Sequence, residues 1–318
     1  MRAARLAAAF ALGLLLAPAA RAFVRSGDPD TKSCLYWSAR DVTYRVNVTR
    51  AGSSPSCGPV GAANAPAVSA IVDGFGAWTA PSCTDLTLSR GQDTTSIAIG
   101  FARDGADENL VVFRKGWCDE DEQARADPCW TDPGERCSAK FNCFGELGTS
   151  HSTIALTTTT YRPSSGEIVD ADMEFVDWTG AGGGGSLGGN RPEGWYFTCF
   201  EPSAEPACTT YGQDGCFSMD LQNTATHEAG HFVGLAHNPE DAETTMAATA
   251  APGETKKRSL TEDDEAGVCA IYPRGAPPAV CASRDDDGGG CASGGGAGVL
   301  GLLSLLALGR RYRTTTPA

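Results

Sequence analysis

Apolar and polar positions alternate in several separate stretches of the chain. In residues 35–50, the apolar side chains stand at every second position, which is the period of a half-buried strand. The alternating residues are Val42, Tyr44, Val46 and Val48. Similar patterns predict further strands at residues 85–89, 95–101, 109–114, 152–161 and 167–178. The last two are joined by the turn Arg-Pro-Ser-Ser-Gly, so we expect them to pair.

Helical spacing occurs in three other stretches. Between Ala67 and Trp78, apolar residues recur every three or four positions, which predicts an amphipathic helix. A second helix is expected after Asp220, whose carboxylate can cap it. A third begins at Thr261, whose spacing to Asp264 fits a capping box. The side chains that the second helix is expected to bury are Leu221, Ala225, Ala229, Phe232 and Val233.

The second of these helices carries metal-binding residue types at short spacings. His227 and His231 lie four positions apart, so on a helix both imidazoles can reach the same ion. Glu228 stands where it can take a proton from a water molecule that this ion activates. A third ligand on the next turn would be crowded, so the chain must bend, and Gly234 can adopt positive φ without strain. His237 then arrives from outside the helix, which leaves one tetrahedral position open.

Three of the four histidines in the chain stand in this one pattern. Five specified residues at these spacings arise by chance on the order of a few times in a million chains of this composition. The pattern therefore favours a catalytic zinc site over a helix with surface histidines.

The order His-Glu-x-x-His-x-x-Gly-x-x-His resembles the long zinc signature of metzincin metalloproteases. Metzincins carry a methionine turn under the metal site, and Met246 follows the third histidine at a suitable distance. Astacins and serralysins place a tyrosine ligand two residues after that methionine, where this chain has Ala248. Residues 259–272 resemble the closing helix of matrixins. The chain is therefore similar to the matrixin branch of the metzincins.

This resemblance implies both a fold and an activity. The implied fold is an α+β, zincin-like catalytic domain over residues 23–274, with a mixed twisted sheet, an active-site helix, a backing helix and a C-terminal helix. The implied activity is that of a zinc-dependent endopeptidase acting on a protein or peptide substrate. A bound peptide would pair with the edge strand at residues 152–161. The implied site comprises one catalytic Zn²⁺ on His227, His231 and His237, Glu228 as general base, and Gly234 and Met246 as structural support.

Two rival functions belong to other classes. The chain could be a non-catalytic, disulfide-rich surface protein that binds zinc and peptides, although Glu228 in its proper place counts against that. It could also be a structural protein of the cell surface in which the zinc helix has lost its original function.

The family resemblance also has implications for further metal sites. Many matrixins hold a structural zinc on three histidines and an aspartate near these strands. Only His151 is left here, and Glu174 stands where another ligand would be, so we expect no structural zinc and a surface role for His151. Asp170 and Asp172 share one face of their strand. The sequence leaves Ca²⁺ binding there open, although too few oxygen ligands can be placed.

Thirteen cysteines indicate an oxidising compartment. If Cys291 belongs to the C-terminal tail, six bridges can form among the other twelve. Two inserts depart from the family pattern: residues 115–150, expected to be stapled by disulfides rather than to bind metal, and residues 179–217, which form either part of the cleft rim or a slack loop. Neither Cys34 nor Cys57 stands in the Pro-Arg-Cys-Gly context of a matrixin latency cysteine.

Both ends of the chain carry targeting patterns. Residues 1–22 combine arginines, a short apolar run and an Ala-Arg-Ala site, which predicts a signal peptide. Residues 275–290 are a Pro/Gly/Asp linker. Residues 291–318 combine a cysteine, a short apolar run and a basic end, and they are similar to the sorting tails of exported myxobacterial surface proteins. A simple membrane anchor is the alternative for this tail.

The negative net charge of the chain limits the classes of molecule that it can bind. The formal net charge is −14, and removing residues 1–22 and 292–318, which hold arginines and no acids, makes it more negative. This argues against nucleic acid or an anionic membrane as the partner. We expect an exported monomer, secreted or at the cell surface, with membrane contact only through the tail.

Overall fold

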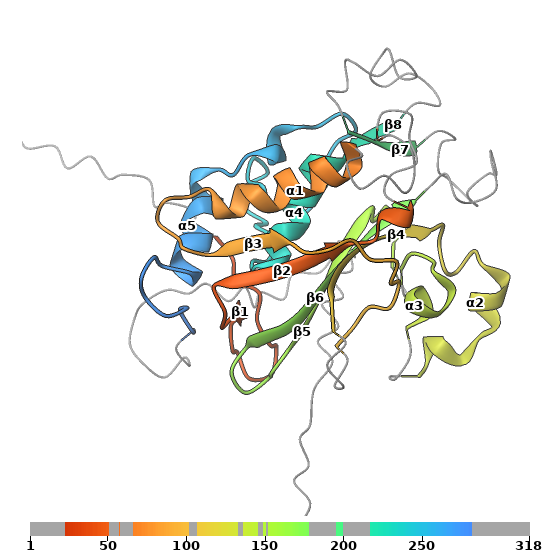
Figure 1. Cartoon of the computed structure of the whole chain (residues 1–318), viewed down its shortest axis with the longest axis horizontal. Helices are drawn as coiled ribbons and strands as arrows, with labels where there is room; N and C mark the ends of the chain where they lie inside the picture. Colours follow the sequence, from red (N-terminus) through yellow and green to blue (C-terminus); the bar gives the residue numbers. More distant parts are fainter. Residues whose placement is uncertain are drawn as a thin grey trace, which may run out of the picture.

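A twisted sheet of six strands forms the centre of the molecule (Figure 1). The computed structural model describes residues 23–50, 57, 66–101, 107–132, 136–145, 149–150, 152–177, 195–199 and 217–281. The sheet contains β1 (Tyr36–Trp37), β2 (Asp41–Val46), β3 (Thr87–Arg90), β4 (Asn109–Lys115), β5 (Ala155–Tyr161) and β6 (Glu167–Asp177). A second, small sheet pairs β7 (Trp195–Thr198) with β8 (Phe217–Asp220).

The pairing in the main sheet is parallel except at one edge. The strand order is β1-β6-β4-β2-β3, and all of these neighbours run parallel. Strand β5 lies antiparallel to β6, with Leu156 opposite Glu174 and Thr158 opposite Asp172. Among the described strands, β5 pairs with β6 alone, so it is an edge strand.

Two long helices pack against each other on one face of the sheet (Figure 1). They are α1 (Pro66–Thr79) and α4 (Leu221–Phe232). A Cβ at Gly74 of α1 would lie 2.9 Å from Ala225 Cβ of α4, so glycine allows the helices to approach this closely. Trp78 Nε1 donates to Thr226 O at 2.7 Å, which satisfies the indole in the core. The aromatic ring of Phe75 stacks on Tyr44 of β2, joining the helix pair to the sheet.

The C-terminal helix α5 (Glu262–Ile271) closes the domain. Its N-terminus is a complete capping box, as the sequence predicts. The Thr261 hydroxyl accepts from Asp264 N, and the Asp264 carboxylate accepts from Thr261 N. Just past its end, Tyr272 OH donates to Val233 O at 2.9 Å and accepts from Trp37 N at 3.0 Å. The fully buried Tyr272 therefore ties α5 to the end of α4 and to β1.

Two of the strand predictions need correction. The single strand expected over residues 35–50 is divided into β1 and β2, and it ends at Val46 because Asn47 Oδ1 accepts from Thr49 N and turns the chain into the 3₁₀ helix η1 (Val48–Arg50). The strand expected at residues 95–101 does not form. Backbone groups there bond to side chains instead, because Ile97 O accepts from Arg114 and Gly100 N donates to Asp172.

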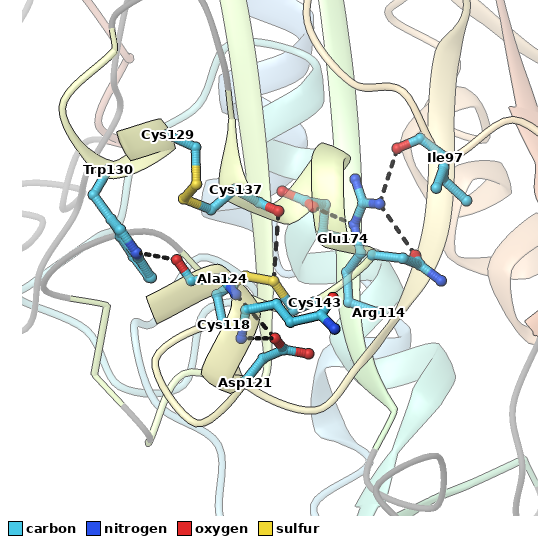
Figure 2. Close-up of a disulfide and its surroundings, with 12 residues drawn as sticks. Ile97, Arg114, Cys118, Asp121, Ala124, Cys129, Trp130, Cys137, Cys143 and Glu174 are labelled. Carbon is cyan, nitrogen blue, oxygen red and sulfur yellow. Dashed lines mark hydrogen bonds and ion pairs between the residues drawn. A yellow bond between two sulfur atoms is a disulfide. The ribbon is translucent and has the colours of Figure 1, made fainter. Parts of the chain in front are cut away.

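The insert between β4 and β5 is held by two disulfides, as expected (Figure 2). Cys118 pairs with Cys143 and Cys129 with Cys137, around α2 (Glu122–Ala126), the 3₁₀ helix η3 (Pro128–Trp130) and α3 (Cys137–Phe141). Three more disulfides join distant segments: Cys34–Cys281, Cys57–Cys199 and Cys83–Cys269. The cysteines at 208, 216 and 291 lie outside the described residues, as do most of the insert at 179–217, the signal peptide and the tail.

The first residues of the expected linker at 275–290 are bonded to the domain. Ala279 N donates to Ile271 O, and its carbonyl accepts from Arg25, next to the Cys34–Cys281 disulfide. Within the described part of the chain, no helix combines the length and apolar character that a membrane span requires.

Candidate metal centre

The helix that carries the first two histidines is fixed at its N-terminus by a capping aspartate. The Asp220 carboxylate accepts from Asn223 N at 2.7 Å and from Arg258 Nε at 2.9 Å. Ten of the twelve residues of α4 are buried, so packing on several sides sets the direction in which its side chains point. His227 and His231 lie one turn apart on this rigid element.

The chain reverses direction at Gly234. Its φ is +96°, and an added Cβ would lie 2.6 Å from Leu35 O, so the position excludes other residues both by conformation and by space. The N-terminal segment braces the loop that follows, because Ser26 N donates to Gly234 O at 2.9 Å and Ala236 N to Val24 O at 2.8 Å. His237 is therefore returned toward α4 by a loop that is bonded on both sides.

The three imidazoles converge on one point. The Nε2 atoms of His227 and His231 each lie 3.1 Å from His237 Nε2. His227 Nδ1 lies 2.7 Å from Thr245 O, and His231 Nδ1 lies 2.9 Å from Leu235 O. Since a carbonyl oxygen only accepts, both Nδ1 atoms carry the hydrogen and both Nε2 lone pairs face the common centre. A tetrahedral zinc about 2.05 Å from each nitrogen would hold them about 3.3 Å apart, so the donor set fits this ion.

Burial keeps these rings neutral. Loss of water lowers the pKa of His231 to about 4 and of His237 to about 3, and that of His227 falls well below its ordinary value. The charge that each neighbouring imidazole would carry lowers the pKa of His227 and His237 further. Neutral imidazole is the form that binds metal, so the cluster is ready to accept an ion at neutral pH.

Glu228 lies beside this cluster with only 5% of its surface exposed. The Thr157 hydroxyl of β5 donates its hydrogen to Glu228 Oε2 at 2.7 Å, and its oxygen lies 3.1 Å from the Glu228 carbonyl oxygen. Burial raises the pKa of Glu228 to about 7, although the Thr157 hydrogen bond and the charge of Lys257 act in the opposite direction. A carboxyl with this pKa can both accept and return a proton near neutral pH.

Met246, the methionine of the expected turn, packs against the helix that carries His227 and His231. An added Cβ at Gly230 of α4 would overlap Met246 Sδ, so these two residues are in close packing. The carboxylate of Asp264 in α5 accepts from Thr245 N at 2.8 Å and Met246 N at 3.3 Å. The sequence predicts that Asp264 caps the helix α5. Asp264 also fixes the backbone of the methionine turn, and this second role depends on tertiary contacts.

Glu174 is neutralised by a buried cation. Arg114 Nε lies 2.5 Å from Glu174 Oε1, with both side chains almost fully buried (Figure 2). The same guanidinium donates to Ile97 O and to Asn142 Oδ1 of the insert. This ion pair occupies Glu174, and the lack of a structural zinc stays a prediction. His151 lies outside the described residues.

Asp170 and Asp172 are both fully buried on β6. Asp172 accepts from Gly100 N and from Leu110 N, whereas neither oxygen of Asp170 meets a donor among the described residues. Burial, together with nearby carboxylates, raises the pKa of Asp170 to about 9 and that of Asp172 to about 7. Within the described residues, the three histidines are the one group of three or more metal-binding side chains, so calcium binding stays a prediction.

Comparison with known proteins agrees with this geometry. The family model described as matrixin matches residues 36–273, which is most of the chain. The chain belongs to the matrixin family. A segment of 55 residues is also 44% identical to metalloendoproteinase 1-MMP of Arabidopsis thaliana, and it covers 17% of this chain and 15% of that protein. The α+β metzincin fold expected from the sequence is thereby confirmed.

In this matrixin, the residues singled out from the sequence come together. His227, His231 and His237 form the cluster, Glu228 follows the first of them on the same helix, and Met246 packs against Gly230 of that helix. Sequence reasoning missed Thr157 and Gly230. Each depends on a partner that is distant along the chain, and no local pattern marks either one.

Proposed function

We propose that this matrixin is an exported endopeptidase that hydrolyses peptide bonds with Glu228 as the general base. The convergence of three neutral imidazoles beside a buried carboxylate supports the proposal most strongly. When bound by His227, His231 and His237, zinc supplies Lewis acidity, which acidifies water and polarises a carbonyl group.

The residues of the chain supply the proton transfers. Glu228 is held against β5 by Thr157, so its carboxylate cannot rotate away from the cluster without losing a 2.7 Å hydrogen bond. It accepts the proton of the attacking water and returns it to the leaving amine, as its pKa of about 7 allows. Gly234 and the capped helix α4 keep the imidazole of His237 close to those of His227 and His231.

A substrate peptide would bind along β5. That strand pairs only with β6 among the described strands, and Thr157 in its middle contacts Glu228. An extended peptide that adds to the free edge of β5 by main-chain hydrogen bonds would therefore bring its scissile bond close to Glu228. This geometry favours an extended protein or peptide segment over a compact small molecule.

Export is supported by the disulfides. Five bridges lie within the described residues, and three of them join segments more than a hundred positions apart. Such bonds persist in oxidising compartments and are rare in the cytosol. We therefore place the working enzyme outside the cytosol, in line with the signal peptide predicted at residues 1–22.

The variant Glu228→Gln tests the proposal. It keeps the shape of the side chain but removes the base, so casein hydrolysis should fall by about a hundredfold or more while zinc content, measured by atomic emission, stays the same. A zinc chelator should abolish the activity of the unaltered protein. Glu265→Gln, at an exposed position on α5, is the matched control and should hydrolyse casein normally. Full activity in Glu228→Gln would exclude this role for Glu228.

A further inference from the structure

Asp264 is a buried carboxylate of α5 that bonds to two different segments. Only 1% of its surface is exposed. It accepts from Thr261 N at 2.9 Å and from the Thr261 hydroxyl at 2.7 Å, at the start of its own helix. It also accepts from Thr245 N at 2.8 Å and from Met246 N at 3.3 Å, in the methionine turn. The first pair of bonds belongs to the helix cap, whereas the second pair reaches a segment next to the metal centre.

The peptide group between Thr245 and Met246 joins Asp264 to His227. Its N–H, on Met246, donates to the Asp264 carboxylate, and its carbonyl oxygen, on Thr245, lies 2.7 Å from His227 Nδ1. The peptide group is trans, so its N–H and its C=O point in opposite directions. The carboxylate and the imidazole therefore lie on opposite sides of one peptide group, which bridges them.

The charge of Asp264 strengthens this bridge. Hydrogen bonds in a chain polarise one another, so a carboxylate that accepts the N–H of a peptide makes the carbonyl oxygen of the same peptide a better acceptor. Thr245 is fully buried, so water does not screen the effect. A stronger acceptor at Nδ1–H makes the imidazole of His227 more basic at Nε2, which is the atom that faces the common centre.

His231 has no such carboxylate behind its acceptor. Its Nδ1 lies 2.9 Å from Leu235 O, and the N–H of that same peptide group, on Ala236, donates to Val24 O at 2.8 Å. Leu235 O also accepts from the Ser26 hydroxyl at 2.8 Å. The acceptor of His231 is thus backed by a neutral carbonyl and shared with a second donor. The two histidine ligands of α4 therefore differ in the charge that lies behind the peptide group.

We propose that Asp264 is a positioning residue of the metal centre, which acts through the Thr245–Met246 peptide group to strengthen the hydrogen bond to His227 and thereby the binding of zinc by that ligand. This inference deepens the proposed function, because it rests on zinc binding by the histidine cluster. A role limited to capping α5 and packing the methionine turn would not make the His227 hydrogen bond depend on the charge of Asp264.

Proton NMR of the zinc-loaded, ¹⁵N-labelled protein tests this inference, because a stronger hydrogen bond moves its proton resonance downfield. In the unaltered protein, the Nδ1 proton of His227 should resonate downfield of that of His231. Asp264→Asn keeps the size of the side chain but removes the charge. In this variant the His227 resonance should move upfield, while the His231 resonance stays in place as an internal reference. Zinc affinity, measured by competition with a chromogenic chelator, should fall about tenfold.

Thr261→Ala is the matched control, because it weakens the cap of the same helix and leaves the Asp264 carboxylate against the methionine turn. It should lower stability without moving the His227 resonance or changing zinc affinity. An unmoved His227 resonance in a folded Asp264→Asn variant, or an equal shift in Thr261→Ala, would overturn the inference.

The unaltered protein decides the question if Asp264→Asn fails to fold. A His227 proton that does not resonate downfield of the His231 proton would then overturn the inference. A protein that binds no zinc at the cluster would instead contradict the proposed function.

Discussion

Thr157 on the edge strand donates a 2.7 Å hydrogen bond to the carboxylate of Glu228 on the zinc helix. The same hydroxyl oxygen lies 3.1 Å from the Glu228 carbonyl. One residue of β5 thus contacts both the side chain and the backbone of the proposed base. This single contact fixes the proposed base relative to the strand that would bind the substrate. Alignment of the substrate is therefore coupled to catalysis.

Removal of that contact should weaken catalysis without emptying the metal site. Thr157→Val keeps the size of the side chain but loses the donor, so the carboxylate is no longer oriented. We expect kcat/KM to fall by roughly 10- to 100-fold, with unchanged zinc content. Thr157→Ser, which restores the hydroxyl, should recover most of the activity. Equal activity in the valine and serine variants would show that the hydroxyl does not position Glu228.

The packing of Gly230 against Met246 leads to a second prediction. A methyl group at Gly230 would overlap Met246 Sδ and press on Trp78, so Gly230→Ala should displace the methionine turn. We expect a loss of about 1–3 kcal/mol in the free energy of unfolding, measured by urea denaturation, together with weaker zinc retention. Gly76→Ala on the exposed side of α1 is the control, because an added Cβ there meets nothing within 4 Å. This control should stabilise the protein by about 0.5–1 kcal/mol. A Gly230→Ala variant as stable as the unaltered protein would disprove the tight packing.

The buried pair Asp170 and Asp172 predicts a pH dependence of stability. Burial raises their pKa values to about 9 and about 7, against about 4 in an unfolded chain. For an acid with a raised pKa, the stability contribution is complete below the unfolded pKa and is lost as the pH rises through the folded pKa. The folded protein should therefore lose stability between pH 6 and pH 9.

Asp170→Asn removes one of these ionisations. In calcium-free buffer, the Tm of the variant should exceed that of the unaltered protein at pH 9 by about 5 °C more than at pH 6. Asp73→Asn, at an exposed position of α1, should show no such divergence. Parallel Tm curves for Asp170→Asn and the unaltered protein would mean that folding does not raise the pKa of Asp170.

The strands show where reading a pattern along the chain fails. Residues 95–101 alternate like a strand, yet their backbone bonds to Arg114 and Asp172 rather than to a neighbouring strand. Alternation reports that one face is buried, but it does not report which groups satisfy the backbone. The burial of Asp170 and the Arg114–Glu174 ion pair likewise have no signal in the local sequence, since charged residues are usually exposed.

The sequence by itself determined the metal-binding cluster and the family resemblance. His227, Glu228 and His231 share one helix, and Gly234 permits the turn that returns His237, so helical period and one backbone angle suffice to bring them together. The tertiary structure alone decided what surrounds the cluster: Thr157 of β5 bonds to Glu228, Asp264 of α5 bonds to Thr245 and Met246, and Met246 packs against Gly230. Local geometry is set by residues close along the chain, whereas orientation and charge in the site depend on packing between segments that only folding brings into contact.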